Sequence, residues 1–297
     1  MNYGDLFTGV GGFSLAMKRV FPSAFCSYWS EINKSSIETY LKNFPHNHSK
    51  NIGDISSYVF DENGEPNDFR IGCLPRVDFL FAGSPCQDLS IQTKNRKGLK
   101  GSRSNLFYAF AHIVRVKKPK YFLLENVASM SEEDRDTISE VLGVQPMRIC
   151  SDFITPQMRD RLYWFNWDIE TKDLWDRGVR NHSLVRWSKS GRTPKPDGTV
   201  LDTWKQNENG KYYQDREYRD GKANTLTGGW ACSGQSSKTF VDDKGTLREL
   251  TPEEAEVLQS FPPGWTEGVS DNQRYKQIGN AVTVKVIETI LRGIKNV

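Results

Sequence analysis

The sequence predicts an α/β fold built on a parallel sheet. Two short apolar runs, residues 77–82 and 121–124, are each followed at once by polar residues, as expected for buried parallel strands that end at a site. A third observation is a glycine-rich turn, residues 8–12, between a short strand at residues 3–7 and an amphipathic helix. In open α/β sheets the carboxyl ends of the strands form the binding edge, so we expect the functional residues there.

Length and composition limit the class of protein. The 297 residues suffice for one large α/β domain and a smaller one, and the net charge is only +3. The five cysteines form no Cys-x-x-Cys pair, which indicates reduced thiols in a cytoplasm and no metal site. No run approaches the ~18 apolar residues that span a bilayer, and the start lacks the basic and apolar regions of a secretory signal. We therefore expect a cytoplasmic protein with no membrane partner.

The N-terminal part predicts alternating helices and strands. After a helix at residues 13–20, we expect a strand at 24–30, a helix at 33–44 and a third strand ending near Asp54. Residues 61–76 are polar and contain Gly and Pro, so we interpret them as a surface excursion. Glu31 lies 20 residues beyond Gly11, where a carboxylate can bind ribose hydroxyls in a nucleotide-type fold.

Cys86 follows the strand at residues 77–82 on a stiff turn. Pro85 fixes its own φ and restrains Ser84, so the turn that carries the thiol is rigid. A cysteine here is either a small buried hydrophobe or a nucleophile, and the octapeptide alone does not separate the two. Residues 91–102 are basic and without periodicity, so we expect a mobile loop that acts as a lid.

The next segments bring further charged groups to strand ends. A helix at residues 105–116 leads to the strand at 121–124, which delivers Glu125 as either an ion-paired acid or a general acid that faces Cys86. A helix at 132–142 and a strand at 147–153 follow. Arg159 and Arg161, two residues apart before a strand at 162–167, are predicted to project to one side, either to bind phosphate or carboxylate or as surface charges.

The texture of the sequence changes at about residue 168. Strongly apolar runs disappear, and aromatic and basic residues interleave, which suits a nucleic-acid contact module. Near the C-terminus, Thr251 as N-cap, Pro252 at N1 and Glu254 at N3 predict a helix to about residue 261. The motif at residues 277–282 is expected to precede a last helix that runs to 294.

Taken together and in order, these motifs resemble the cytosine-C5 DNA methyltransferases over nearly the whole chain. The motifs that carry the resemblance are Asp5-Leu6-Phe7-x-Gly9-x-Gly11-Gly12, Glu31, Asp54, Pro85-Cys86-Gln87, Arg103, Glu125-Asn126-Val127, Gln157-x-Arg159-x-Arg161, Arg248-x-Leu250-Thr251-x-x-Glu254-Ala255, Phe261-Pro262 and Gly279-Asn280-Ala281-Val282. Local stretches are similar to the catalytic domains of animal de novo DNA methyltransferases, whereas the compact length is more like a bacterial or phage enzyme.

The resemblance implies a fold, an activity and a cofactor. The fold is a Rossmann-like sheet of the class I S-adenosylmethionine-dependent methyltransferases, formed by residues 1–167 and 270–297, with a smaller target-recognition domain at 168–269. The activity is methyl transfer from S-adenosylmethionine to C5 of a flipped cytosine in double-stranded DNA, through a covalent bond between Cys86 and C6. Because the recognition region is short for the family, we expect a short recognition site. A second departure is Thr283, which stands where a proline is frequent after the Gly-Asn motif.

The resemblance also implies a role for each motif residue. The residues implied to be catalytic are Cys86, Glu125, Arg159 and Arg161. Those implied to bind the cofactor are Phe7, Gly9, Gly11, Gly12, Glu31, Ile32, Asp54, Ile55, Gly83, Pro85, Leu106, Asn280 and Val282. Those implied to contact DNA or the flipped base are Gln87, Ser90, Lys97, Arg103, Asn126 and Thr227, and residues 91–103 form the lid over the base.

Three other interpretations were compared with this one. A tRNA methyltransferase of the same fold typically carries a Cys-Phe-Thr segment, which this chain lacks. An inactive DNA-binding relative would not need the complete set of catalytic residues, and a nicotinamide-dependent oxidoreductase would leave the cysteine and Glu-Asn-Val motifs unexplained. The expected partners are therefore double-stranded DNA and a cognate restriction endonuclease, with the chain a monomer or a homodimer.

Overall fold

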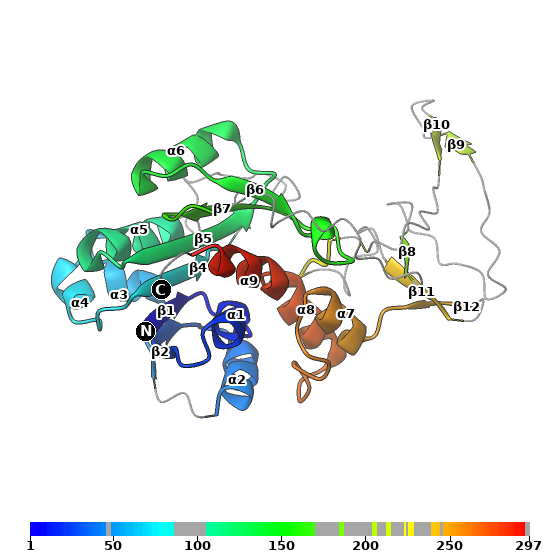
Figure 1. Ribbon diagram of the computed structural model, residues 1–297, viewed down its shortest axis with the longest axis horizontal. Coiled ribbons are helices and arrows are strands. Elements are labelled where there is room, and N and C mark those ends of the chain that lie inside the picture. Colours follow the sequence, from blue (N-terminus) through cyan, green and yellow to red (C-terminus); the bar gives the residue numbers. More distant parts are fainter. Residues whose placement is uncertain are drawn as a thin grey trace. The chain divides into compact units, whose positions relative to one another are not determined.

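A seven-stranded mixed sheet organises the first of two units (Figure 1). The computed structural model describes residues 1–45, 49–85, 105–169, 184–186, 204–206, 212–214, 223, 225–228, 239–243 and 246–294. In spatial order the strands are β3 (Lys50–Asn51), β2 (Phe25–Ser30), β1 (Asn2–Leu6), β4 (Phe79–Gly83), β5 (Tyr121–Val127), β7 (Asp160–Phe165) and β6 (Met147–Cys150). The unit comprises residues 1–150, 160–171 and 281–297.

The parallel sheet that the sequence predicts is confirmed for the five strands β1 to β5. Each of these strands pairs in parallel with its neighbour. β7, whose direction the sequence does not predict, runs antiparallel to both β5 and β6. The connection between β6 and β7 is too short for a parallel crossover, which needs a dozen or more residues, and this explains the reversed direction.

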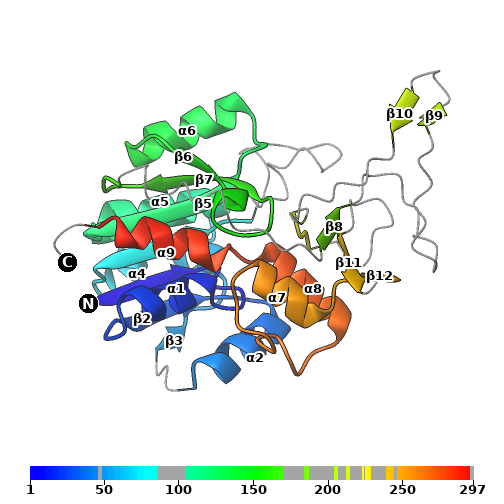
Figure 2. The same ribbon diagram turned by 45° about the vertical axis from the view of Figure 1, so that its right-hand side comes forward.

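Helices cover both faces of this sheet (Figures 1 and 2). One face carries α1 (Gly12–Val20), α2 (Lys34–Asn43) and α9 (Val284–Arg292), and the other carries α3 (Ile55–Val59), α4 (Asp68–Gly72), α5 (Asn105–Lys117) and α6 (Glu132–Leu142). On the first face, the ring of Phe13 stacks on Phe81 of β4, and Arg19 of α1 forms a 2.8 Å ion pair with Glu288 of α9. The second face holds a continuous apolar core that includes Leu80, Phe110 and Trp164.

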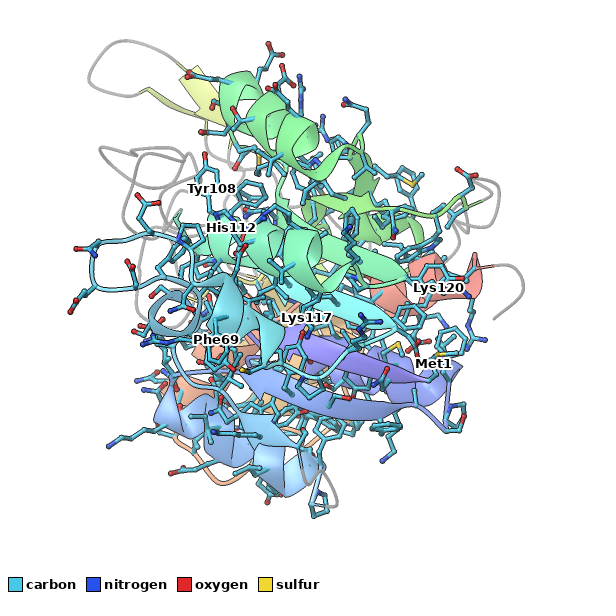
Figure 3. All side chains as sticks on the ribbon, turned by 90° about the vertical axis from the view of Figure 1, so that its left-hand side faces the viewer. Met1, Phe69, Tyr108, His112, Lys117 and Lys120 are labelled. Carbon is cyan, nitrogen blue, oxygen red and sulfur yellow. The ribbon has the colours of Figure 1, made fainter. Side chains whose placement is uncertain are left out.

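The segment predicted to be a surface excursion contains structure that the sequence pattern does not reveal. Residues 61–76 include α4, capped by Asn67, and bury Ile71 completely. Five residues are too few to show a helical period, so the polar composition misled the interpretation. The ammonium of Lys117 at the end of α5 donates to the carbonyls of Gly72 and Leu74, which ties the two helices together; Figure 3 shows this side of the unit.

Several predicted boundaries also shift. β5 extends to Val127, so Glu125 lies inside the strand instead of after it. The strand expected at 147–153 ends at Cys150 and continues as a 3-10 helix, η2 (Ser151–Phe153). The motif at residues 277–282 does precede the last helix, α9, and its first four residues form the end of α8 (Asp271–Asn280). None of the helices in the described residues is long and apolar enough to cross a membrane.

The second unit comprises residues 151–159 and 172–280. It contains β8 (Leu184–Arg186), β11 (Thr239–Asp243) and β12 (Thr246–Glu249) in one antiparallel sheet, β9 (Trp204–Gln206) and β10 (Tyr212–Gln214) in another, and the helices α7 (Pro252–Leu258) and α8. The capping box predicted at Thr251 and Glu254 is confirmed, although α7 ends at Leu258 and not near 261. Ser260, with φ of 66°, follows the end of this helix.

Glu256 stabilises the second unit from its interior. Its fully buried carboxylate accepts hydrogen bonds from the backbone N–H groups of Gly264, Trp265 and Thr266, at 2.6, 3.1 and 2.9 Å. It also lies 3.1 Å from Nη2 of Arg274 on α8. A buried charge is tolerated only when it is paired and hydrogen-bonded, so this one carboxylate fixes both α8 and the loop after α7.

We predict that Glu256→Gln lowers the free energy of unfolding by ~3 kcal/mol, because it removes the buried charge that the Arg274 guanidinium and three backbone N–H groups share. Glu253 is the matched control, since it pairs with the same guanidinium at 2.6 Å but has a side chain 45% exposed. Glu253→Gln is expected to cost less than ~1 kcal/mol. Urea unfolding of both variants measures the difference, and equal losses would contradict the role assigned to burial.

Candidate functional site

The last paired residues of two neighbouring strands, Gly83 and Glu125, lie side by side at the centre of the sheet. β4 and β5 pair in parallel up to the register Gly83–Glu125, so these two residues are neighbours. A Cβ built on Gly83 would lie 3.7 Å from Oε2 of Glu125, which places the carboxylate beside the start of the turn that leads to Cys86. Glu125 is only 8% exposed. The prediction that this acid stands at the edge of the sheet near the cysteine turn therefore has a structural basis in the strand register.

Arg161 is the charge partner of Glu125. Val127 pairs with Arg161 across β5 and β7, and Nε of Arg161 lies 2.9 Å from Oε1 of Glu125. Within the described residues Oε1 accepts no hydrogen bond, so the two groups form an ion pair without a well-directed N–H donor. A buried carboxylate oxygen with unused acceptor capacity is suited to receive a proton or an N–H group from a ligand.

The glycine-rich turn after β1 is fixed by its unusual backbone. Phe7, Gly9 and Gly11 have φ of 56°, 55° and 88°. Positive φ at a non-glycine residue is strained and frequently marks a binding site. A Cβ on Gly11 would lie 2.6 Å from the ring of Phe44 and 2.9 Å from that of Tyr40, so the backbone here packs directly against α2.

Glu31 is held at the edge of this turn by backbone donors. Its Oε2 accepts from the N–H of Gly9 at 2.9 Å, and its Oε1 accepts from those of Ile32 and Asn33 at 2.8 and 2.7 Å. A carboxylate offers about four acceptor positions, so one remains on Oε2 for a hydroxyl donor. The neighbouring Ile32 is 70% exposed and offers an apolar surface beside the acid.

Asp54 and Ile55 follow β3. Asp54 caps α3 by accepting from the N–H of Ser56 at 2.9 Å. Burial raises the pKa of Asp54, but hydrogen bonds from Ser56 and Ser57 outweigh it, so the pKa lies below its ordinary value. The side chain of Ile55 packs in the core, so only its backbone can face a ligand. The first unit also contains three further predicted cofactor residues. Gly12 is the first residue of α1, Leu106 lies in the first turn of α5, and Val282 lies just before α9.

Three of the predicted site residues, Arg159, Thr227 and Asn280, lie in the second unit. Arg159 is 3% exposed, and its Nη1 donates to the carbonyls of Leu226 and Gly279 at 2.8 and 3.1 Å. A Cβ on Gly279 would lie 2.3 Å from the backbone of Thr227, and the amide of Asn280 packs against Gly228. Arg159 therefore joins the segment around Thr227 to the end of α8. The two arginines of the motif bind different partners: Arg159 binds carbonyls, and Arg161 binds Glu125.

Comparison with known proteins identifies the family. The model of the C-5 cytosine-specific DNA methylases matches residues 1–173 and 170–296. The chain is 29% identical to the Type II methyltransferase M.NlaX of Neisseria lactamica, over 98% of this chain and 95% of that protein. It is 30% identical to M1.ScrFI of Lactococcus lactis subsp. cremoris, over 96% and 76% respectively. The chain belongs to the C-5 cytosine-specific DNA methylase family.

The fold is that of the S-adenosylmethionine-dependent methyltransferases. The S. pombe Dnmt2 methyltransferase structure superimposes with a TM-score of 0.68, at 18% identity, and the match covers 98% of this chain and 97% of that one. Membership in the family makes the chain a DNA (cytosine-5-)-methyltransferase with S-adenosylmethionine as methyl donor. The glycine turn, the spare acceptor position of Glu31 and the exposed Ile32 fit this cofactor, because adenosine presents hydroxyls and a flat apolar ring.

Some predicted residues of the methyltransferase lie outside the described residues. These are Cys86, Gln87, Ser90, Lys97 and Arg103, together with the proposed lid at 91–103. The structure adds one residue that the sequence analysis missed. The amide oxygen of Asn51 accepts from the N–H groups of Glu31 and Gly53 at 3.2 and 3.0 Å, and so holds the backbone at Glu31 and just before Asp54. A polar residue just before the Gly53-Asp54 step was the only signal in the sequence.

We predict that Gly11→Ala weakens S-adenosylmethionine binding by tenfold or more, because a Cβ would press on Tyr40 and Phe44 and displace the turn. Gly64→Ala is the matched control, since Gly64 has a similar φ of 81° but nothing lies within 4 Å of its Cβ. Isothermal titration calorimetry with the cofactor measures the effect. Equal affinity in Gly11→Ala and wild type would contradict the close approach at this turn.

Asp5 beneath the turn generates a prediction about pH. Burial raises the pKa of Asp5 to about 7, opposed by the hydrogen bond from Ser14 at 2.7 Å, and Glu31 raises it slightly further. Between the unfolded pKa near 3.8 and this value, the folded state holds a proton that the unfolded state has lost. Raising the pH across this window therefore removes stability, by on the order of 4 kcal/mol for this group, until the folded pKa is passed.

Asp5→Asn removes this titration. We expect the difference in unfolding free energy between variant and wild type to favour the variant more at pH 8 than at pH 4.5. Urea unfolding at the two pH values measures it, and because every other titrating group is common to both proteins, their contributions cancel. A difference that does not change with pH would show that Asp5 titrates near its ordinary pKa.

Proposed function

We propose that Cys86 is the nucleophile of this methyltransferase and that Glu125 is its acid. Cytosine C5 is a poor nucleophile, so a thiolate must first form a bond to C6 and convert C5 into an electron-rich enamine carbon. That addition places negative charge on the ring. A proton on the carboxyl of Glu125, or its hydrogen bond at N3, relieves this charge, and Arg161 supports both the acid and the anionic ring.

The rest of the cycle follows from the same groups. S-adenosylmethionine supplies the methyl group that forms the new bond to C5. Loss of the C5 proton to a base then restores the double bond and expels the thiolate of Cys86. The observation that carries this proposal is the placement of the Glu125 carboxylate beside Gly83, three residues before the cysteine, with Arg161 at 2.9 Å.

Cofactor contacts are assigned to the first unit. We assign the ribose to Glu31, the adenine amino group to Oδ2 of Asp54, and stacking of the adenine ring to Ile32. Oδ2 of Asp54 accepts a long hydrogen bond from the hydroxyl of Ser57, at 3.3 Å, and retains acceptor capacity. Sequence recognition is assigned to residues 168–269, with a short recognition site in double-stranded DNA.

The partners follow from the relatives. Because relatives such as M.NlaX and M1.ScrFI are named Type II methyltransferases, we propose a cognate restriction endonuclease as a partner in the cell and a cytoplasmic location. Bisulfite sequencing of DNA from cells that express the chain identifies the methylated sequence. Digestion of that DNA with endonucleases of the same specificity tests whether the modification protects it.

We predict that Cys86→Ala abolishes methyl transfer while cofactor binding survives, and that Glu125→Gln slows it by about 100-fold or more, because general acid catalysis contributes 10²–10⁴. Cys73→Ala and Glu140→Gln are matched controls, since both positions are exposed. Transfer of a tritiated methyl group to duplex DNA and to tRNA, assayed side by side, provides the measurement. Methylation of DNA by Cys86→Ala, or of tRNA alone by wild type, would contradict the proposal.

A further inference from the structure

The side chain of Asn126 joins the end of β5 to Ser84, the residue that follows β4. Asn126 is 1% exposed. Its Nδ2 donates to Oγ of Ser84 at 2.9 Å and lies 3.4 Å from the carbonyl oxygen of Ser84, while its Oδ1 accepts from the N–H of Val127 at 2.7 Å. An amide that directs its donors to a single residue, in a site closed to water, holds that residue in place.

These bonds begin where the sheet pairing stops. The parallel ladder between β4 and β5 ends at Gly83 and Glu125, and Ser84 is the next residue along the chain. Asn126 is likewise the next residue after Glu125. The hydrogen bond from its side chain to Ser84 therefore continues the pairing of β5 with the segment after β4 by one residue beyond the last backbone pair.

The following residue makes Ser84 the effective anchor of the turn. Pro85 has no N–H group to bond and a φ fixed near −65°. It also confines Ser84 to extended conformations. One stiff residue thus separates Ser84 from Cys86, and the position of the anchor is transmitted along it.

We propose that Ser84 and Asn126 form a positioning pair that sets the turn from which Cys86 attacks. This role differs from the base contact that the family resemblance implies for Asn126, and Ser84 has no role in that resemblance. The inference rests on the proposed nucleophile. Both side chains are buried and bind each other. We therefore expect their loss to change the rate of the covalent step and to leave the KM for S-adenosylmethionine unchanged.

Ser84→Ala is the decisive variant, because it removes one hydroxyl and leaves Asn126 in place. Ser84→Thr keeps the hydroxyl and is the rescue variant. Ser139→Ala is the matched control. Ser139 lies on α6, not at the cysteine turn, and is also a buried serine, 4% exposed. Its Oγ accepts from Nε1 of Trp164 at 3.0 Å. If all buried serine hydroxyls act only through stability, the two alanine variants behave alike.

The measurement is the rate at which the full-length protein, with S-adenosylmethionine, forms a denaturant-stable complex with duplex DNA that contains 5-fluorocytosine. We expect Ser84→Ala to trap DNA ~10- to 100-fold more slowly, since a shift of about 1 Å in a reacting group can cost 10²-fold. Ser84→Thr is expected to recover most of the rate and Ser139→Ala to retain all of it. Thermal unfolding confirms that each variant is folded.

Three outcomes would overturn the inference: trapping by Ser84→Ala at the wild-type rate, an equal loss in Ser139→Ala, or a loss that a raised KM explains entirely. A wild-type protein that methylates DNA but traps no 5-fluorocytosine duplex would remove the nucleophile itself, and the proposed function with it. The two failures are therefore distinguished by the wild-type lane of the same experiment.

Discussion

The parallel register of β4 against β5 is the constraint on which the site depends. Because Gly83 pairs with Glu125, the chain leaves β4 beside the acid, and the next residues on both strands are joined through Asn126 and Ser84. A slip of one residue would turn Glu125 to the opposite face of the sheet and separate it from Arg161. The apolar side chains of both strands, buried on both faces, make such a slip costly, so the packing of the sheet fixes the geometry of the site.

Three buried carboxylates in this chain show how a local environment decides what a charge does. Glu256 receives hydrogen bonds from three backbone N–H groups and an arginine, and so is fully committed to structure. Asp5 accepts from Ser14 and pairs with no cation among the residues that the structure describes, and burial raises its pKa. Glu125 has the Arg161 guanidinium in contact, but within the described residues its buried Oε1 accepts no hydrogen bond. Of the three carboxylates, Glu125 is therefore the one that the surrounding framework satisfies least.

The sequence predicts the fold class well where local signals are strong. The glycine turn, the capping box at Thr251 and the parallel strands β1 to β5 all follow from turn chemistry and apolar runs. It fails where tertiary packing overrides local pattern. The antiparallel β7 depends on a short connection after β6, and α4 depends on the burial of Ile71 within a polar stretch. Asn51 and Ser84 were not identified as functional, because a single polar residue beside a motif carries no period or spacing.

Motif residues serve the framework as well as the chemistry. Arg159 carries a charge, yet its guanidinium donates to the carbonyls of Leu226 and Gly279, and Asn126 donates to Ser84 in the same way. Both bonds join a segment that lacks regular pairing to the end of a helix or strand. A catalytic group must be held within a fraction of an ångström of its reacting position, and irregular backbone cannot supply that rigidity by itself. Buried side chains that bind carbonyls and hydroxyls provide it, which is why a motif for chemistry also contains residues that hold the backbone.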